Sequence, residues 1–235
     1  MGMRDHTMPV VRAEAGEPLA ALDGAALTLR RTAAASALAS RYLSRTDSRR
    51  LTMIGAGALA PRLIAAHATV RQIADVTIWN RTPAKAEALA TEIEREGLAV
   101  RATTDLEAAV KHADIVSVAT MTDRPILRGK WLAPGAHIDL VGAYTPAMRE
   151  SDDDAIRRCR IFVDTRIGMR ESGDIAQPLG SGVISESDIA ADLHDLARSR
   201  TPARRSADEI TLFKSVGNAI EDLAAAVVVW KGLNP

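Results

Sequence analysis

The segment RRLTMIGAGALA, residues 49–60, decides the fold of this 235-residue chain. A short apolar run, expected to be a buried strand, ends on glycine, and Gly55, Gly57 and Ala60 then follow the pattern G-x-G-x-x-A. In a strand–turn–helix unit, the first glycine permits the tight turn, the second lets the backbone approach a pyrophosphate, and the small third residue lets the helix pack closely. The helix N-terminus also directs N–H groups and a positive dipole end at the phosphates. The segment therefore predicts a dinucleotide-binding turn; the alternative is a strand–helix turn that binds nothing.

Apolar runs alternate with helical patterns from this turn onward. Longer helices are expected at 58–72 and 83–97, and shorter ones from the Thr104–Glu107 capping box and from Thr145. Six strands are expected, at residues 49–55, 75–79, 98–103, 114–120, 137–143 and 160–165. This alternation predicts an α/β fold with a Rossmann-type, doubly wound parallel sheet.

The two ends of the chain carry other patterns. Residues 8–23 predict two short strands around a glycine turn, and residues 27–43 predict a helix rich in Ala and Leu. Residues 171–205 are expected to be helical and loop-like. A last helix is expected to open with the Ser206–Glu209 capping box and to run to about Lys231, with apolar residues at helical spacing: Ile210, Phe213, Ile220, Leu223 and Val227.

The composition excludes several classes of function. Thirty Lys and Arg residues balance thirty Asp and Glu residues, which argues against bulk electrostatic binding to nucleic acid or to membranes. The single cysteine, Cys159, allows no intrachain disulfide and favours a reducing compartment. The longest apolar run, residues 223–230, is too short to span a bilayer, and no signal peptide is apparent. A cytoplasmic protein without a metal site is expected, because the five histidines have no metal-ligand spacing.

The second expected strand ends without the acid that many dinucleotide-binding proteins carry there. In DVTIWNRTPAKAEAL, residues 75–89, the strand is followed by Asn80, Arg81 and Thr82, and Pro83 starts the helix. An acid at this point bonds the ribose 2′-OH, whereas a guanidinium matches the geometry of a 2′-phosphate. The segment therefore favours NADP(H) over NAD(H); the alternative is an ordinary surface arginine.

The carboxyl ends of two further strands are expected to line the cofactor crevice. These ends are Ala119–Thr120–Met121 and Val141–Gly142–Ala143–Tyr144. Gly142 suits a place where a nicotinamide passes close to the backbone. For Met121, simple packing is an equal alternative.

Eight segments together resemble the ornithine cyclodeaminase/mu-crystallin family. In family order they are LRRTAAASALASRYL, IGAGALA, IWNRTPAKA, ADIVSVAT, GKWLAPGAHIDLVGAYTPAMRESDD, CRIFVDT, ESGD and TLFKSVGNAIEDLAAA, which span residues from about 16 to 233. The resemblance implies a Rossmann domain that binds a nicotinamide cofactor. It also implies a second domain, built from the N-terminal part and the C-terminal helix, that binds substrate and forms a dimer.

The resemblance also assigns roles to individual residues. Arg31 is expected to hold the substrate carboxylate, and Glu171 in ESGD is expected in the substrate pocket. The cofactor contacts that it implies are Thr32, Gly55, Ala56, Gly57, Ala58, Asn80, Arg81, Thr82, Thr120, Met121 and Ser215, to which Gly142 is added from its place at a strand end. Spacing alone favours two surface arginines at 30 and 31, a helix-ending turn at ESGD, and the polar side of the last helix for Lys214.

Two departures from the family pattern bear on function. Only about fifteen residues precede GEPLAALDG, where family members carry most of the second domain, so residues 1–46 are expected to be a remnant of that domain. The Rossmann domain is expected at 47–185, and 186–235 is expected to return as helices to the second domain. Tyr144 stands where cyclodeaminases carry a catalytic Asp, and a phenol is a poor base near neutral pH. Tyr144 is therefore expected to line the substrate pocket.

The expected function is NADPH-dependent reduction of a cyclic imino acid, either Δ1-pyrroline-2-carboxylate or Δ1-piperideine-2-carboxylate, by a homodimer. One alternative is an ornithine cyclodeaminase, which would convert ornithine to proline and ammonia. Another is a non-enzymatic NADPH-binding protein, because the short N-terminal part leaves catalytic competence open.

Overall fold

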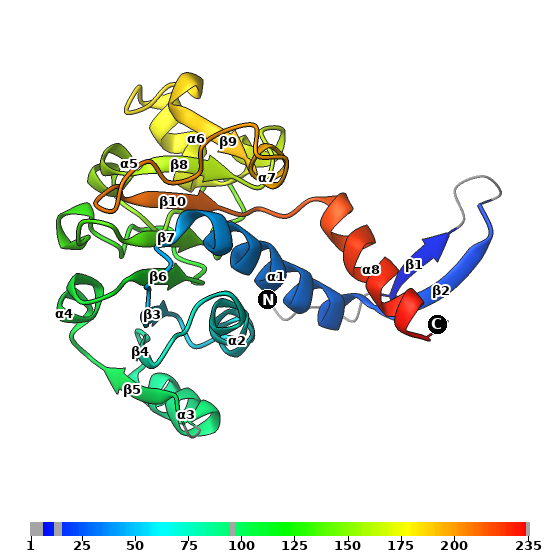
Figure 1. The fold of residues 1–235 in the computed structure, drawn as a ribbon, viewed down its shortest axis with the longest axis horizontal. Coiled ribbons are helices and arrows are strands. Elements are labelled where there is room, and N and C mark those ends of the chain that lie inside the picture. Colours follow the sequence, from blue (N-terminus) through cyan, green and yellow to red (C-terminus); the bar gives the residue numbers. More distant parts are fainter. Residues whose placement is uncertain (1–6, 12–15, 95–96, 234–235) are drawn as a thin grey trace.

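A computed structural model describes residues 7–11, 16–94 and 97–233. Its main sheet has eight strands in the order β5-β4-β3-β6-β7-β10-β8-β9, and every neighbouring pair is parallel (Figure 1). The bounds are β3 Arg50–Ile54, β4 Asp75–Trp79, β5 Ala99–Thr103, β6 Ile115–Val118, β7 His137–Leu140, β8 Arg160–Val163, β9 Ile189–Asp192 and β10 Thr211–Lys214. The predicted doubly wound parallel sheet is confirmed.

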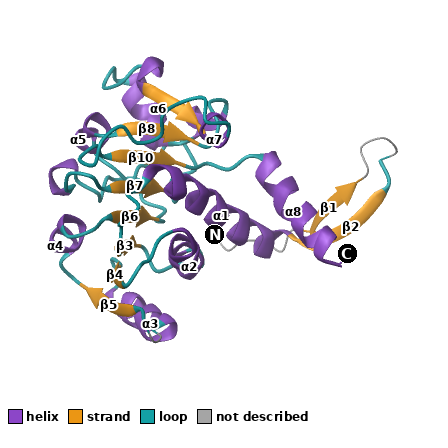
Figure 2. Cartoon of the chain, viewed as in Figure 1, coloured by secondary structure: helices purple, strands orange, loops and turns teal. Residues whose placement is uncertain are grey.

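The chain runs outward from β3 in both directions, because it first adds β4 and β5 on one side and then crosses to β6 and β7 on the other. Helices alternate with the strands on both faces (Figure 2). Their bounds are α1 Gly24–Leu43, α2 Ala60–Val70, α3 Pro83–Ile93, α4 Leu106–Lys111, α5 Asp153–Arg158, α6 Gly173–Gly180, α7 Leu193–Ala197 and α8 Ala219–Leu233, with 3₁₀ turns at Gly129–Trp131, Gly168–Glu171 and Glu186–Asp188. The reversal of strand order places a crevice at the carboxyl ends of β3 and β6, where ligands bind in open α/β sheets.

Alternating strand residues supply the two faces of the sheet with separate cores. On one face, Leu51, Met53 and Ile115 are buried beneath α2 and α3, and this core continues to Phe162 and Phe213 beneath α1 and α7. On the other face, α4, α5 and α6 cover buried residues that include Val116, Val118, Ile138, Leu140, Ile161 and Leu212. Both faces are therefore dry, as a parallel sheet requires.

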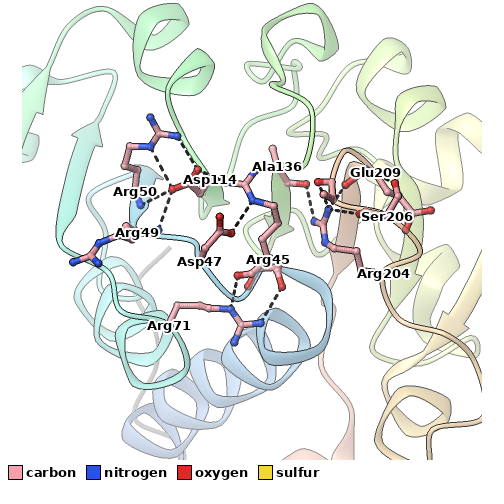
Figure 3. A network of polar contacts seen from close by, with 12 residues as sticks. Arg45, Asp47, Arg49, Arg50, Arg71, Asp114, Ala136, Arg204, Ser206 and Glu209 are labelled. Carbon is pink, nitrogen blue, oxygen red and sulfur yellow. Dashed lines mark hydrogen bonds and ion pairs between the residues drawn. The ribbon is translucent and has the colours of Figure 1, made fainter.

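An arginine-rich network anchors the C-terminal end of α1 next to the amino ends of the sheet strands (Figure 3). The carboxylate of Asp114, just before β6, accepts from the amide of Arg50 at 3.0 Å and pairs with Arg45 at 2.9 Å. Burial opposes ionisation of Asp114, yet the hydrogen bonds from the Arg50 side chain and from the backbone amides of Arg49 and Arg50 lower its pKa to about 2. Arg71 donates to the carbonyls of Ser40 and Arg41 in the last turn of α1, and to those of Ser44 and Arg45 beyond the helix end. The helix end is thereby fixed against the sheet.

The first part of α1 leads away from the sheet toward a hairpin and α8 (Figure 1). The hairpin consists of antiparallel β1, Thr7–Val11, and β2, Pro18–Asp23, and Asp23 caps α1 by accepting from the amide of Ala26. The two strands predicted within residues 8–23 and the helix predicted at 27–43 are therefore confirmed. The apolar residues of α8 that were expected to pack at helical spacing, Ile220 and Leu223 among them, are exposed.

The predicted last helix is wrong in its first half. Residues 211–214 form β10 in the middle of the sheet, and α8 begins only at Ala219. The hydroxyl of Ser206 accepts from the amide of Glu209 in a turn that starts no helix. Periodicity cannot tell a short buried strand from a buried helix, and all four residues of β10 are buried. Residues 186–235 therefore contribute two strands, β9 and β10, and are not helical throughout.

Two shorter elements also differ from expectation. No helix forms at Thr145, because the segment that follows is held in turns and α5 starts later, capped by Asp152. The helix predicted from Thr104 is capped instead by Asp105, whose carboxylate accepts from the amide of Ala108. Among the described residues, no helix is both long enough and apolar enough to cross a membrane.

Candidate functional site

The glycine turn has the geometry that its sequence predicts. The amide of Gly55 donates to the carbonyl of Trp79 at 2.8 Å, and Gly55 has a φ of +112°. A Cβ at Gly55 would lie 2.5 Å from the carbonyl oxygen of Ala119, so a larger residue would collide with the end of β6. A Cβ at Gly57 would meet nothing within 4 Å, and Gly57 is exposed. The backbone at Gly57 is thus open to an approaching pyrophosphate.

The end of β4 is tied to this turn by Asn80. Its Oδ1 accepts from the amide of Ala56 at 3.3 Å, and its Nδ2 donates to the carbonyl of Thr82 at 3.0 Å. Thr82 holds the N-cap position of α3, as predicted, but its hydroxyl makes no capping bond. Asn80 therefore orders the turn, and its expected bond to the adenosine ribose stays a prediction.

Two exposed cations stand beside Asn80. Arg81 lies just before α3 and Lys85 lies in its first turn, and within the described chain neither side chain forms a hydrogen bond or an ion pair with another residue. Both residues line the same cavity, beside the end of β4. Sequence reasoning missed Lys85, although a second cation so soon after Arg81 could have indicated it.

A cavity of about 340 Å³ lies between the glycine turn, the end of β4 and the end of β6, within the range of small-molecule sites. It brings together eight of the expected cofactor residues: Gly55, Ala56, Gly57, Asn80, Arg81, Thr82, Thr120 and Met121. Met121 is 67% exposed and lines the cavity rather than packing in the core. The cavity also contains Trp79, Thr122 and Ile126, which no pattern in the sequence indicated.

The other four expected cofactor residues lie around this cavity without lining it. Ala58 is exposed in the glycine turn, whereas Thr32 on α1, Gly142 and Ser215 are buried. The amide of Ser215, just after β10, donates to the carbonyl of Leu140 at 3.1 Å. Their contacts with a cofactor stay predictions.

Gly142 has a structural reason of its own. A Cβ at this position would lie 1.9 Å from the carbonyl oxygen of Thr120 and 2.5 Å from Oε1 of Glu150. The close contact between the ends of β6 and β7 therefore requires glycine, whether or not a nicotinamide passes here.

A group of buried charges lies behind that contact. Glu150 and Lys214 are fully buried, and Nζ of Lys214 lies 3.5 Å from Oδ2 of Asp174, on α6. Lys214 is thus part of the sheet interior, and its expected place on the polar side of a helix is wrong. Sequence reasoning missed Glu150 and Asp174, because nothing in their spacing brings residues 150, 174 and 214 together.

Arg31 is not the surface arginine that spacing alone favours. Its side chain is 14% exposed, with Nη1 3.1 Å from Glu221 and Nε 3.0 Å from Asp222, both on α8. Gly217, with a φ of +90°, packs against the guanidinium, since a Cβ there would lie 2.3 Å from Nη1. Burial, followed by the nearby charge of Asp164, raises the pKa of Glu221 to about 7.

The other two expected substrate residues are exposed. Tyr144 is 52% exposed, and Glu171 ends the 3₁₀ turn before α6. Neither side chain makes a hydrogen bond or an ion pair with another residue of the described ranges. Their roles in a substrate pocket stay predictions.

One cluster could in principle hold a metal ion. Asp192, His194 and Asp195 each offer a ligand atom, and these atoms lie within 4.8 Å of one another. The carboxylate of Asp192 already caps α7 through the amide of Asp195. Asp195 also lies 3.6 Å from Arg200. These contacts account for the acids, and we assign no metal to them.

The cavity has features that suit a nicotinamide dinucleotide: an open glycine turn before α2 and, beside the end of β4, two exposed cationic side chains. The fold agrees with solved structures. The chain superposes with a TM-score of 0.93 and 35% identity on Thermococcus litoralis Δ1-pyrroline-2-carboxylate reductase in complex with NADH and L-proline, over 96% of this chain and 70% of that one. An archaeal alanine dehydrogenase dimer with bound NAD gives a TM-score of 0.91 at 30% identity, over 96% and 70% of the two chains.

Sequence comparison gives the same relationship. The chain is 41% identical over 216 residues to Δ1-pyrroline-2-carboxylate reductase of Colwellia psychrerythraea, covering 91% of this chain and 68% of the relative. The chain thus spans about two thirds of the length of these relatives. Residues 3–234 match the ornithine cyclodeaminase/mu-crystallin family. The chain therefore belongs to the ornithine cyclodeaminase/mu-crystallin family.

Proposed function

We propose that this chain is a nicotinamide-dependent reductase that converts a cyclic imino acid to the cyclic amino acid, with Δ1-pyrroline-2-carboxylate as the first candidate substrate. The observation that carries the proposal is the superposition on the Thermococcus litoralis reductase, which was solved with both NADH and the product L-proline. The Δ1-piperideine ring stays an alternative substrate of the same chemical class.

The residues of the cavity support a preference for NADPH. Arg81 and Lys85 would hold the 2′-phosphate, because they are exposed and are not neutralised by a described carboxylate. The amides of the glycine turn and the start of α2 would hold the pyrophosphate. When bound, the reduced nicotinamide supplies the hydride, and the protein supplies orientation. The two solved relatives bind NADH and NAD. The preference of this chain is therefore tested by measuring the ratio of its affinities for NADPH and NADH.

On the substrate side, one guanidinium nitrogen of Arg31 is available to bind the substrate carboxylate. Nη1 and Nε face the two acids of α8, whereas Nη2 has no partner in the described part of the chain. Two carboxylates beside one guanidinium leave a negative surplus, which would oppose a substrate carboxylate. Protonation of Glu221, whose pKa lies near neutrality, removes that surplus. We therefore infer that Arg31 orients the substrate carboxylate while Glu221 carries a proton.

A turnover experiment tests the proposal. Purified protein is incubated with NADPH or NADH and with Δ1-pyrroline-2-carboxylate or Δ1-piperideine-2-carboxylate, and loss of nicotinamide absorbance is followed. We expect oxidation that depends on both imine and protein. Release of ammonia from ornithine without net oxidation of the cofactor would favour a cyclodeaminase. Binding of NADPH with no turnover of either substrate would favour a non-enzymatic binding protein. The predicted homodimer and cytoplasmic location stay predictions.

A further inference from the structure

Glu150 lies behind the cofactor cavity and is fully buried. It uses both carboxylate oxygens to accept four hydrogen bonds. Oε1 accepts from the amide of Thr120 at 2.7 Å and from its hydroxyl at 2.8 Å. Oε2 accepts from the amides of Gly142 at 2.8 Å and Ala143 at 3.2 Å. One side chain thus satisfies three backbone amides and a hydroxyl, at sites that are buried or partly buried.

The donors come from the carboxyl ends of two neighbouring strands, β6 and β7. Thr120 lines the cavity. Gly142 lets the two strand ends come so close together that a Cβ at this position would collide with the backbone of Thr120. At this part of a doubly wound sheet, the nicotinamide end of a dinucleotide passes the strand ends. The position of Thr120, and with it one wall of the cavity, therefore depends on the carboxylate behind it.

The charged groups that face Glu150 come from two further elements. From α6, Oδ1 of Asp174 accepts from the amides of Glu150 at 2.8 Å and of Ser151 at 3.0 Å. From β10, the buried Lys214 faces Oδ2 of the same aspartate. Burial raises the pKa of Glu150 to about 7; Lys214 and the hydrogen bonds from Thr120 oppose this rise, and Asp174 adds to it.

We propose that Glu150 is a positioning residue of the cofactor site, whose ionised carboxylate holds the ends of β6 and β7 in the arrangement that receives the nicotinamide, and whose protonation weakens that arrangement. A protonated carboxyl presents an O–H to a row of donors, so at least one of the four hydrogen bonds is lost. The proposal rests on the proposed nicotinamide site. It does not depend on which imine is reduced.

The variant Glu150→Gln tests the proposal, because an amide keeps the shape but offers one acceptor oxygen and places an NH₂ group against the remaining donors. The dissociation constants of NADPH and NADH are measured by titration between about pH 6 and about pH 8. For the unmodified chain, we expect affinity to rise with pH through about 7, since binding favours the ionised form. For Glu150→Gln we expect affinity about tenfold weaker and free of that rise. The 2′-phosphate of NADPH also titrates near this pH range. Because NADH lacks that phosphate, the pH dependence of NADH affinity reports Glu150 without it.

Asp139→Asn is the matched control. Asp139 is also fully buried, and its Oδ2 accepts from Ser117 at 2.8 Å and contacts His67 at 3.2 Å, within the sheet and away from the cavity. We expect this variant to lower thermal stability while the affinity for the cofactor and its pH dependence stay as in the unmodified chain.

Three outcomes would overturn the proposal. If Glu150→Gln keeps both the affinity and its pH dependence, Glu150 does not position the site. If Asp139→Asn weakens binding as much as Glu150→Gln does, the effect is general destabilisation. A chain that binds neither NADPH nor NADH overturns the proposed function and this proposal together. Cofactor binding that follows Glu150 as expected, without turnover of an imine, supports the positioning role while the proposed substrate fails.

Discussion

Nη1 of Arg31, on α1, lies 3.1 Å from Oε2 of Glu221, on α8, and joins residues that are 190 positions apart in the chain. With Asp222 on the same guanidinium, this contact fixes the start of α8 against α1, beside the turn that follows β10. The residue proposed to hold the substrate is therefore held in place by the last helix of the chain.

Replacing Arg31 with lysine should separate substrate binding from cofactor binding. An ammonium keeps the charge but cannot contact two acids and a carboxylate in one plane. We expect the KM for the imine to rise about tenfold or more, as for the loss of a hydrogen bond to a charged group, while the dissociation constant of NADPH stays the same. Arg30→Lys is the control, because Arg30 is exposed and, within the described part of the chain, its side chain bonds only the carbonyl of Ala26. An equal change in both variants would contradict the role of Arg31.

The pKa of Glu221 gives a prediction for stability. Its value in the folded chain, about 7, lies above the ordinary 4.5, so the folded state favours the proton. The contribution to stability is complete below the ordinary pKa and is lost as pH rises through about 7. We expect the Tm of Glu221→Gln to fall less than that of the unmodified chain between about pH 5 and about pH 8. Because Glu150 is present in both proteins, the difference reports Glu221, and identical pH profiles would refute the assignment.

Replacing Gly142 or Gly57 with alanine should have different effects on stability and on cofactor affinity. Gly142→Ala places a Cβ against the backbone of Thr120, so we expect a loss of stability of about 1–3 kcal/mol or more. Gly57→Ala meets open space, so its stability should stay within about 0.5 kcal/mol. Its affinity for the cofactor should fall, since the added methyl group lies where the pyrophosphate approaches. Denaturant titration and cofactor titration of both variants measure the contrast.

Cofactor preference should depend on Arg81. We expect Arg81→Ser to lower the affinity for NADPH about tenfold or more while the affinity for NADH changes little, because only the 2′-phosphate loses a charged partner. Arg101→Ser is a suitable control, since Arg101 is exposed on the neighbouring strand and pairs with Asp75 away from the cavity. If the ratio of the two affinities is unchanged in Arg81→Ser, the 2′-phosphate lies elsewhere or NADPH is not preferred.

More of the fold than of the candidate site could be predicted from the sequence. The six expected strands form because alternating buried segments and a glycine turn are local signals. β10 was mistaken for helix because four buried residues are too few to show a period, and its placement between β7 and β8 is decided by tertiary packing. Motifs also indicated the cofactor side of the site, since the glycine turn and the end of β4 are each continuous in sequence.

The remaining parts of the site are assembled from distant segments. Glu150, Asp174 and Lys214 meet only because β6, β7, β10 and α6 converge, and no local pattern marks a buried carboxylate that accepts from strand ends. Arg31 could be singled out by resemblance, but its partners Glu221 and Asp222 follow from the packing of α8 on α1. Such contacts cannot be derived from spacing, because spacing describes one element at a time.

The most direct measurement for the central claim is the stoichiometry of a single reaction. The unmodified chain is incubated with NADPH and Δ1-pyrroline-2-carboxylate, and proline formed is compared with NADPH consumed. We predict equal amounts of the two, and neither in the absence of protein. Consumption of NADPH without proline, or no reaction with either this imine or its six-membered homologue under conditions where NADPH binds, would contradict the assignment of this chain as a reductase of cyclic imino acids.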